Sequence, residues 1–316
     1  MLTITVGIPT FRRPDVLLHT IKAVQLQNHP AVIEIVILDQ TPDEETSSQF
    51  KQAINSLIAN ETIHYFQSDY PNLPTARNQI IQAAKGDIML WIDDDVLLPD
   101  GFIEQHYKCY TDSICSKKII AVAGLPFHRD QRLCRDVSVI SISNYQQYTK
   151  PNFRETSKIC DWPNVMIGAN HSVLRSFAIK NMGYDEGMNG PFAYYEDADF
   201  TCRLRNNFPE HSIFYNPEAY LIHLIAPAGG CRIASYKKPP LHATTLSTHI
   251  FFWRHVTGLS KIKFLFKSLR LGPLRKKNIL NPWLFISSCG GFIKSLWMAH
   301  SRKKQVVSVF SQKKVS

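Results

Sequence analysis

The sequence contains no aspartate or glutamate after Glu218, although residues 219–316 carry 17 lysines and arginines. All 26 acidic residues therefore lie in the first 218 residues, where they outnumber 19 bases and leave a net charge of −7. The whole chain is nevertheless basic, with a net charge of +10. This distribution predicts an acidic body with a basic C-terminal tail, and the tail is the part suited to an anionic partner.

The chain also lacks the cysteine patterns of a zinc site or a disulfide framework. Its seven cysteines are an odd number and include no Cys-x-x-Cys pair. Disulfide-stapled secreted domains and structural zinc sites usually carry paired cysteines at short, regular spacings. We therefore expect free thiols in a reducing compartment.

Long hydrophobic segments are missing as well. The N-terminus, MLTITVGIPTFRRP, has no charged region followed by an apolar stretch of signal-peptide length. The longest late apolar stretch, residues 282–300, is interrupted by glycines, serines and Lys294. A membrane-spanning helix needs about 20 predominantly apolar residues, so this stretch is a poor candidate. These absences predict a cytoplasmic protein without a membrane span.

The first 125 residues alternate between two kinds of segment. Short runs of β-branched and aromatic residues, typical of buried strands, occupy residues 3–8, 34–38, 63–66, 87–92 and 119–124. The segments between them carry apolar residues at helical spacing. The alternation predicts an α/β fold, in which a mainly parallel central sheet has helices on both faces. Ligands of such open sheets bind beyond the carboxyl ends of the strands.

Aspartates follow two of these predicted strands. Asp39 ends one strand, and Asp93, Asp94 and Asp95 follow another. Three like charges repel one another, and burial of an unpaired carboxylate is costly, so the triplet needs an explanation. A solvated surface turn and a cation site are the two interpretations, and the location at the ligand-binding edge favours the cation site.

A second acidic cluster lies in YYEDADFTCRLRN, residues 194–206, which has the pattern of a helix. Glu196, Asp197 and Asp199 fall in its first turn. The helix dipole alone favours acidic side chains there, so a structural and a catalytic role are both open from the residues themselves.

Taken in order, the motifs resemble those of the family 2 glycosyltransferases. The motifs are VGIPTFRRP, EIVILDQTPDEET, LPTARNQIIQAAKGDIMLWIDDDVLLPDGFI, IGANHSVLRS with MGYDE, YYEDADFTCRLR and NPEAYLIH, which together span residues 3–226. Each motif alone is weak, and the specificity lies in their order and spacing. The resemblance implies the fold called GT-A, inverting transfer from a nucleotide-diphospho-sugar donor, and a divalent cation, Mn²⁺ or Mg²⁺.

By this resemblance, Asp93 and Asp95 form the Asp-x-Asp motif of the family. Asp95 would bind the cation directly, Asp93 would face the ribose or the water shell of the metal, and His223 would be a further ligand. The chemistry agrees, because a hard divalent cation held by carboxylates offsets the charge that grows on a departing diphosphate. A structural role for His223 remains the alternative.

The resemblance also implies a set of donor-binding residues: Pro9, Thr10, Arg12, Asp39, Arg77, Asn78, Asp93, Asp94, Asn170 and Arg232. The first three would line the base, Asp39 would accept a hydrogen bond from it, and an Arg232 guanidinium would suit the diphosphate. The chain departs from the family at one point. The common second motif reads Asp-Asp-Gly-Ser, whereas this chain has DQTP, so the base and the backbone contacts of this loop do not carry over.

For catalysis, the resemblance points to the Glu-Asp pair of the second acidic cluster. An acceptor hydroxyl needs a general base at neutral pH. Asp197 would be that base, and Glu196 would position sugar hydroxyls or the acceptor. Asp199 is the competing candidate, because it is close enough on the same helix to share the cleft.

The tail, residues 227–316, lies outside the resemblance. Around residues 259–271, apolar residues at near-helical spacing alternate with lysines and arginines. A basic amphipathic stretch of this kind is suited to an anionic membrane surface. A helix packed on the body and a nucleic-acid contact are the alternatives, but the tail carries no nucleic-acid recognition motif.

We therefore predict a catalytic domain over residues 1–226 and a basic, amphipathic helical extension over 227–316. Within the domain, residues 1–125 would bind the nucleotide and 126–226 the acceptor, a glycan or a lipid-linked sugar at the inner face of the cell membrane. A nucleotidyltransferase is a rival, but VGIPTFRRP lacks the usual glycine-rich phosphate loop. A degenerate glycan- or membrane-binding relative would have lost the carboxylates of Asp93, Asp95 or Asp197, and all three are present.

Overall fold

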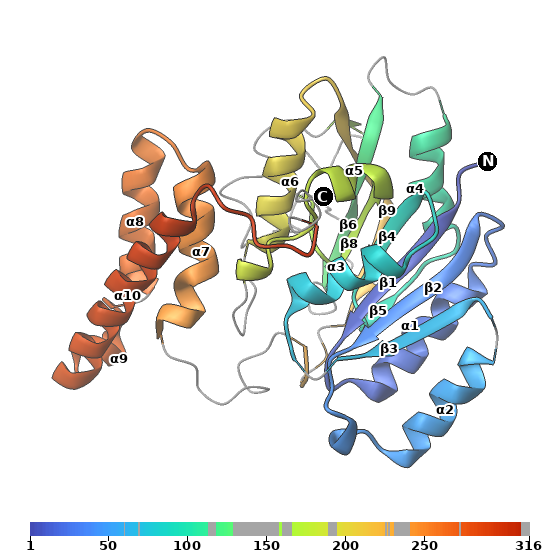
Figure 1. The fold of residues 1–316 in the computed structure, drawn as a ribbon, viewed down its shortest axis with the longest axis horizontal. Helices are drawn as coiled ribbons and strands as arrows, with labels where there is room; N and C mark the ends of the chain where they lie inside the picture. Colours follow the sequence, from blue (N-terminus) through green and yellow to red (C-terminus); the bar gives the residue numbers. More distant parts are fainter. Residues whose placement is uncertain are drawn as a thin grey trace.

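The computed structural model describes residues 1–59, 61–68, 70–112, 118–128, 158–159, 166–188, 195–224, 226, 228–230, 241–271 and 273–310. Its body is built around one sheet with helices on both sides, and four C-terminal helices stand beside it (Figure 1). Much of residues 126–226, the predicted acceptor-binding half, lies outside the described residues. The domain boundary at residue 226 stays a prediction.

Within the described residues, nine strands form the sheet. Eight follow the order β3-β2-β1-β4-β8-β6-β9-β5, and β7 pairs with β9. The first four strands of this order are parallel, and β8 and β5 run antiparallel to their neighbours. The strands are β1 (Ile4–Thr10), β2 (Val32–Asp39), β3 (Ile63–Gln67), β4 (Ile88–Ile92), β5 (Val96–Leu97), β6 (Ile119–His128), β7 (Lys158–Ile159), β8 (Asn170–Leu174) and β9 (Ser212–His223).

The helices of the body connect these strands. They are α1 (Pro14–Leu26), α2 (Ser48–Ile58), α3 (Leu73–Ala83), α4 (Phe102–Thr111), α5 (Arg175–Lys180) and α6 (Glu196–Asn207), with short 3₁₀ turns η1 (Asp43–Glu45) and η3 (Glu186–Met188). Local signals explain several starts. Ser47 and Asn72 cap α2 and α3 through side-chain hydrogen bonds, and a proline lies in the first turn of α1 and of α3.

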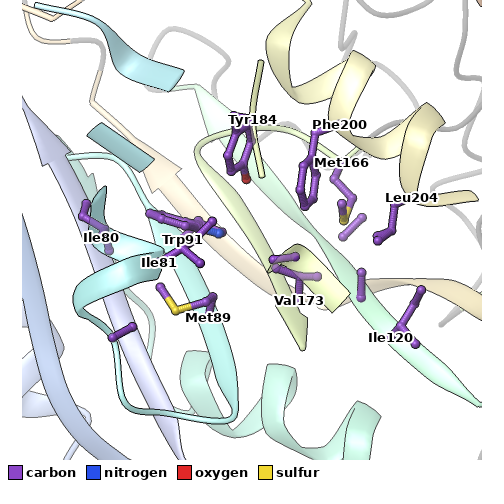
Figure 2. Packing of buried hydrophobic residues seen from close by; sticks show 14 of the residues in the cluster. Ile80, Ile81, Met89, Trp91, Ile120, Met166, Val173, Tyr184, Phe200 and Leu204 are labelled. Atoms are coloured by element: carbon purple, nitrogen blue, oxygen red, sulfur yellow. The ribbon is translucent and has the colours of Figure 1, made fainter. Parts of the chain in front are cut away.

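Two hydrophobic cores cover the two faces of the sheet. One packs α1, α2 and α4 against alternate side chains of β1, β2 and β4. The other packs α3 and α6 against the opposite side chains of the same sheet, with Trp91 fully buried near its centre. Figure 2 shows this second core, in which Trp91 lies beside Ile80 and Ile81 of α3, and Tyr184 lies against Phe200 of α6. The α/β prediction, with helices on both faces, is therefore confirmed.

The C-terminal extension is helical, as the sequence predicts. Its helices are α7 (Leu241–His255), α8 (Leu259–Leu271), α9 (Lys276–Ile279) and α10 (Pro282–Arg302). A third hydrophobic cluster joins α7 to α8, α10 and α6. In Figure 1, α8 and α9 stand farther from the central sheet than α7 does. Among the described residues, no helix combines the length and the apolar character needed to cross a bilayer.

Candidate functional site

Three parallel strands deliver polar side chains to one edge of the sheet. Thr10 ends β1, Asp39 ends β2 opposite Thr10, and Asp93 follows the last residue of β4. All three belong to the carboxyl ends of adjacent parallel strands, where open α/β sheets bind ligands. The structure thus brings together the two aspartate groups that the sequence places after separate strands.

Asp93, Asp95 and His223 form a group that could hold a metal ion, with one ligand atom of each within 4.8 Å of the others. The pairing of β5 with β9 makes this possible, because it sets Val96 opposite His223. His223 Nε2 then lies 2.9 Å from Asp95 Oδ1 and 3.4 Å from Asp93 Oδ2. The three ligands predicted from distant parts of the sequence therefore converge.

The surroundings of Asp95 suit a cation ligand. Its side chain is fully buried, and Ala226 N donates to Oδ2 at 2.7 Å. Burial alone would raise the pKa of Asp95, but His223 and Arg13 lower it, so the carboxylate is ionised near neutral pH. A buried, charged oxygen beside an imidazole nitrogen is a donor set that Mn²⁺ or Mg²⁺ can use.

Asp94 is turned away from this group and paired with Arg13. Arg13 Nη1 donates to Asp94 Oδ1 at 2.6 Å and lies 3.2 Å from Asp95 Oδ2. Thr10 Oγ1 donates to Asp94 Oδ2 at 2.6 Å. Burial raises the pKa of Asp94 to about 6, although Arg13 opposes the shift. Sequence reasoning missed Arg13, and the only signal for it was its place beside Arg12 in FRRP.

The chain after β9 closes over Arg13. Arg13 Nε donates to the carbonyl of Ala228 at 2.9 Å, and Gly230 N donates to the carbonyl of Phe11 at 2.8 Å. Gly229 has a φ of +71°, and a Cβ there would lie 2.6 Å from the Phe11 carbonyl, so this close approach requires glycine. Arg232, which the sequence analysis assigns to the diphosphate, lies outside the described residues.

Asp39 is buried and held by its own loop. Thr41 N donates to Oδ1 and Tyr65 Oη donates to Oδ2, each at 2.8 Å. Burial raises the pKa of Asp39, against the effect of these hydrogen bonds. Thr41 Oγ1 also accepts from Arg12 N, and Gln40 Nε2 donates to the carbonyl of Tyr70. Gln40 and Thr41, which depart from the family motif, therefore hold the ends of β1, β2 and β3 together.

Arg12 and Pro9 differ in exposure. Arg12 adopts a positive φ of 55° and pairs its partly exposed guanidinium with Glu45 of η1. Pro9 is buried within β1, opposite Leu38 of β2. A base-binding role for either residue stays a prediction.

The second acidic cluster lies at the start of α6, which packs on the same face of the sheet as α3. Arg77 Nη1 of α3 lies 3.1 Å from Glu196 Oε1, and both side chains are buried. Burial raises the pKa of Glu196 well above its ordinary value, and the adjacent Asp197 adds to the effect. Gly168 N donates to Asp197 Oδ2 at 2.9 Å, and Ala198 N donates to Oδ1 at 2.7 Å. The carboxylate of Asp197 is thereby held by backbone groups.

Arg77 connects this cluster to the metal-ligand group. Burial alone would lower the pKa of its guanidinium. The pKa is nevertheless raised, because acidic groups including Glu196, Asp93 and Asp197 lie near enough to act on it. The positive charge of the buried Arg77 is therefore favoured by carboxylates of both the Asp-x-Asp motif and the Glu-Asp pair.

Asp199 lies in a different environment from Asp197. Its fully buried carboxylate accepts from Arg203 Nε at 2.7 Å and from Arg254 Nη1 at 2.9 Å, and His255 Nε2 lies 2.8 Å away. Burial would raise the pKa of Asp199, but these cations lower it far below its usual range. Asp199 therefore serves as an ion-pair anchor for α7 and is poorly suited to accept a proton.

Two predicted donor contacts have their side chains bonded inside the fold. Asn78 Nδ2 donates to Glu186 Oε1 at 2.7 Å and to the carbonyl of Tyr184. Asn170 Nδ2 donates to the carbonyl of Ala219 at 2.9 Å, and its Oδ1 lies 2.9 Å from His106 Nε2. Both amides are bonded to other residues of the protein, and their contact with a donor stays a prediction.

Comparison with known proteins agrees with this geometry. A family model described as glycosyl transferase family 2 matches residues 5–179. The match runs from β1 to α5 and includes Asp93 and Asp95, whereas Asp197 and His223 lie beyond it. No curated protein sequence matches the chain.

Many solved structures share the fold, including the following two. The mannosyltransferase PcManGT from Pyrobaculum calidifontis, in complex with GDP-Man and Mn²⁺, is 14% identical with a TM-score of 0.52, over 94% of this chain and 88% of that one. GalNAc-T7 with UDP, GalNAc and Mn²⁺ is 14% identical with a TM-score of 0.55, over 84% of this chain. The match spans 54% of the GalNAc-T7 chain. These likenesses confirm the GT-A type of fold that the motifs predict.

Proposed function

Because the chain belongs to glycosyl transferase family 2, we propose that it moves a sugar from a nucleotide-diphospho-sugar to a hydroxyl of a glycan or lipid-linked acceptor, with inversion at the anomeric carbon. The observation that carries this proposal is the group of Asp93, Asp95 and His223 at the carboxyl ends of the strands. Asp93 and Asp95 suit the diphosphate end of a donor, and Asp197 suits the acceptor end. An inverting displacement needs these two functions on opposite sides of the anomeric carbon.

Asp95, Asp93 and His223 would hold the divalent cation. Both structural neighbours carry Mn²⁺, which supports this assignment. When bound, the cation offsets the negative charge that develops on the departing diphosphate. The protein contributes the geometry: the β5–β9 pairing holds His223 against Asp95, and Ala226 N orients the Asp95 carboxylate.

The donor nucleotide would lie along the carboxyl ends of β1, β2 and β4, beside Thr10 and Asp39. The remaining donor contacts from the family pattern are Pro9, Arg12, Arg77, Asn78, Asp94, Asn170 and Arg232. Of these, Arg77, Asn78, Asp94 and Asn170 have polar partners within the fold, which would hold them in position beside the donor. GDP-Man and UDP are bound by the two neighbours, which leaves the base and the sugar of this enzyme open.

Asp197 would act as the general base. It would take the proton from the acceptor hydroxyl as that oxygen bonds to the anomeric carbon and the bond to the diphosphate breaks. Asp199 is occupied by Arg203, Arg254 and His255, which supports Asp197 over its rival. Glu196, one residue earlier, would orient the reacting sugar or the acceptor.

The acceptor, a glycan or a lipid-linked sugar, would be presented at an anionic membrane, on its inner face in the cell. The charge distribution supports this location, because the tail contains 17 lysines and arginines and no acidic residue. Nucleic acid is not part of the proposal, since the tail has no recognition motif for it.

Hydrolysis of nucleotide-sugars tests the reaction. Purified protein is incubated with a panel of donors, with Mn²⁺ or with EDTA, and release of nucleoside diphosphate is measured. Slow release from one donor that EDTA abolishes supports the proposal and identifies the sugar. Asp95→Asn should behave like EDTA treatment, and Asp100→Asn, which removes an exposed carboxylate nearby, is the matched control. Absence both of hydrolysis and of calorimetric binding of any nucleoside diphosphate with Mn²⁺ would refute it.

A further inference from the structure

Helix α10 packs with its more polar side inward. Trp283, Ile286, Ile293 and Trp297 recur at spacings of three, seven and four residues, so they lie along one side of the helix. Their exposed fractions are 82, 63, 66 and 72%. The buried positions of the same helix are Ser288, Phe292, Ser295 and Ala299. A helix of a free-standing domain normally turns its largest apolar side chains toward the core, so this stripe indicates a partner.

The inward side of α10 is nevertheless specifically packed. His249 Nδ1 of α7 lies 2.7 Å from Ser295 Oγ, and Trp253 Nε1 donates to the carbonyl of Leu296 at 3.2 Å. The ring of Phe292 contacts His249 edge-on, with centroids 4.9 Å apart. These contacts fix the rotation of α10 about its axis. The side of α10 that carries Trp283, Ile286, Ile293 and Trp297 therefore faces outward, because the opposite side packs on α7.

The neighbouring helices extend the same character. In α8, Leu259, Ile262 and Phe266 are 54 to 78% exposed, while Phe264 is buried against Phe252 of α7. Leu274, Ile279 and Leu280, in and around α9, are exposed as well. In all, 12 of the 18 large hydrophobic residues that are exposed in the described chain fall within residues 259–307. We call the exposed apolar residues of α8, α9 and α10 the docking surface.

Charge identifies the kind of partner. Exposed bases lie among the apolar residues of the docking surface, at Lys263, Arg270, Arg275, Lys276 and Lys294. No acidic residue occurs anywhere in residues 219–316. A second copy of the same surface would bring these bases against one another, which disfavours self-association. Trp, Ile and Phe among lysines and arginines suit the boundary between lipid headgroups and acyl chains.

We propose that the docking surface binds an anionic phospholipid bilayer, with α8 and α10 lying along the membrane rather than crossing it. No described helix meets the requirements of a membrane span, which agrees with an interfacial position. The role of this contact, to hold the sugar-transfer site where a lipid-linked acceptor is found, rests on the proposed function. The binding itself does not.

Packing connects the docking surface to the site. Phe264 of α8 approaches Tyr195, with ring centroids 6.2 Å apart, and Tyr195 stacks on Phe251 of α7 at 4.8 Å. Tyr195 directly precedes Glu196 and Asp197 at the start of α6. The outward side of α8 would therefore meet lipid while its inward side helps to seat the catalytic helix.

Vesicle sedimentation tests the proposal. The full chain is mixed with vesicles of phosphatidylcholine alone or of phosphatidylcholine with phosphatidylglycerol, at low and high salt. We expect binding to the anionic vesicles only, weakened by salt, and about tenfold weaker for the double variant Trp283→Ser/Trp297→Ser. Lys294→Glu/Arg270→Glu should weaken binding as well. The matched controls are Leu26→Ser and Lys22→Glu, which change exposed residues of α1.

Two further measurements make the result decisive. Spin-labelled lipid should quench tryptophan fluorescence in the wild type and much less in the double variant. Donor hydrolysis, which needs no membrane, should be unchanged in that variant, so loss of docking and loss of transferase activity are distinguishable. Wild-type protein that ignores anionic vesicles, or a double variant that binds them as well as the wild type, would overturn the proposal. So would a dimer that the double variant dissolves, because the surface would then be a subunit interface.

Discussion

Arg254 of α7 and Asp199 of α6 meet in a buried ion pair, with Nη1 2.9 Å from Oδ1 and side chains 5% and 0% exposed. Arg254 Nη2 also lies 2.6 Å from Asp185 Oδ2. The C-terminal extension is thereby tied to the helix that carries Asp197, two residues before Asp199. The ion pair explains why a tail outside the family match is packed against the body.

Replacement of Arg254 should destabilise the protein. Arg254→Met leaves the buried carboxylates of Asp185 and Asp199 without one of their cations, and loss of one partner of a buried pair costs about 3–5 kcal/mol. Arg254→Lys should recover only part of this, because one ammonium cannot serve both carboxylates as the guanidinium does. Urea denaturation measures the free energy of unfolding. Arg270→Met, at an exposed site of α8, is the control, and an equal loss there would contradict the assignment.

Asp197→Asn and Asp199→Asn should fail in different ways. Asp197→Asn removes the proposed base, so kcat with the natural acceptor should fall about 10²- to 10⁴-fold with little change in donor binding. Asp199→Asn should lower the midpoint of unfolding, because it removes the buried negative charge that Arg203, Arg254 and His255 share. Activity and unfolding are measured on both variants. A normal kcat in Asp197→Asn would remove this residue from the mechanism.

Removal of His223 or Asp95 should abolish tight Mn²⁺ binding. Each supplies a ligand atom of the only three-residue group of this kind found among the described residues. The Mn²⁺ affinity is measured by calorimetric titration with nucleoside diphosphate present. The wild type, His223→Ala and Asp95→Asn are compared. His29→Ala, which removes a histidine paired with Glu104 away from the site, is the control. Unchanged Mn²⁺ affinity in His223→Ala would reassign this histidine to a structural role.

His106 and His171 should each lower the free energy of unfolding as the pH drops from about 6.5 toward 5. Burial lowers the pKa of His106 from 6.5 to about 4, and burial with Arg77 lowers that of His171 to about 3. Both are neutral in the folded chain, whereas the unfolded chain takes up protons below its histidine pKa, so acid favours unfolding. Each group contributes a slope of about 1.4 kcal/mol per pH unit.

Denaturation curves across this pH range measure the slope. His106→Gln should reduce the slope by about 1.4 kcal/mol per pH unit, whatever the variant does to stability at neutral pH. His19→Gln, at an exposed site of α1, is the matched control. A wild-type slope that His106→Gln leaves intact would show that this histidine does not take part.

Local patterns in the sequence were sufficient for the fold class and for the edge of the sheet at which Asp93 and Asp95 lie. Continuous apolar runs followed by aspartates predicted β2, β4 and the ligand-binding edge, because a strand buried on both faces has a recognisable composition and its end faces solvent. Motif order predicted the family. Arg13, by contrast, was missed, since nothing local separates it from Arg12.

Tertiary structure decided the remainder, because those questions depend on contacts between distant residues. Asp197 and Asp199 share one helical turn and are alike in sequence. Contacts with Arg203, Arg254 and His255, the last two more than 50 residues away, distinguish Asp199. His223 reaches Asp95 through the pairing of β5 with β9. The periodicity of α10 shows that it has two different sides, but packing against α7 determines that the tryptophan side faces outward. The sequence specifies which residues lie on each side of a helix, but only the tertiary structure determines which side faces solvent.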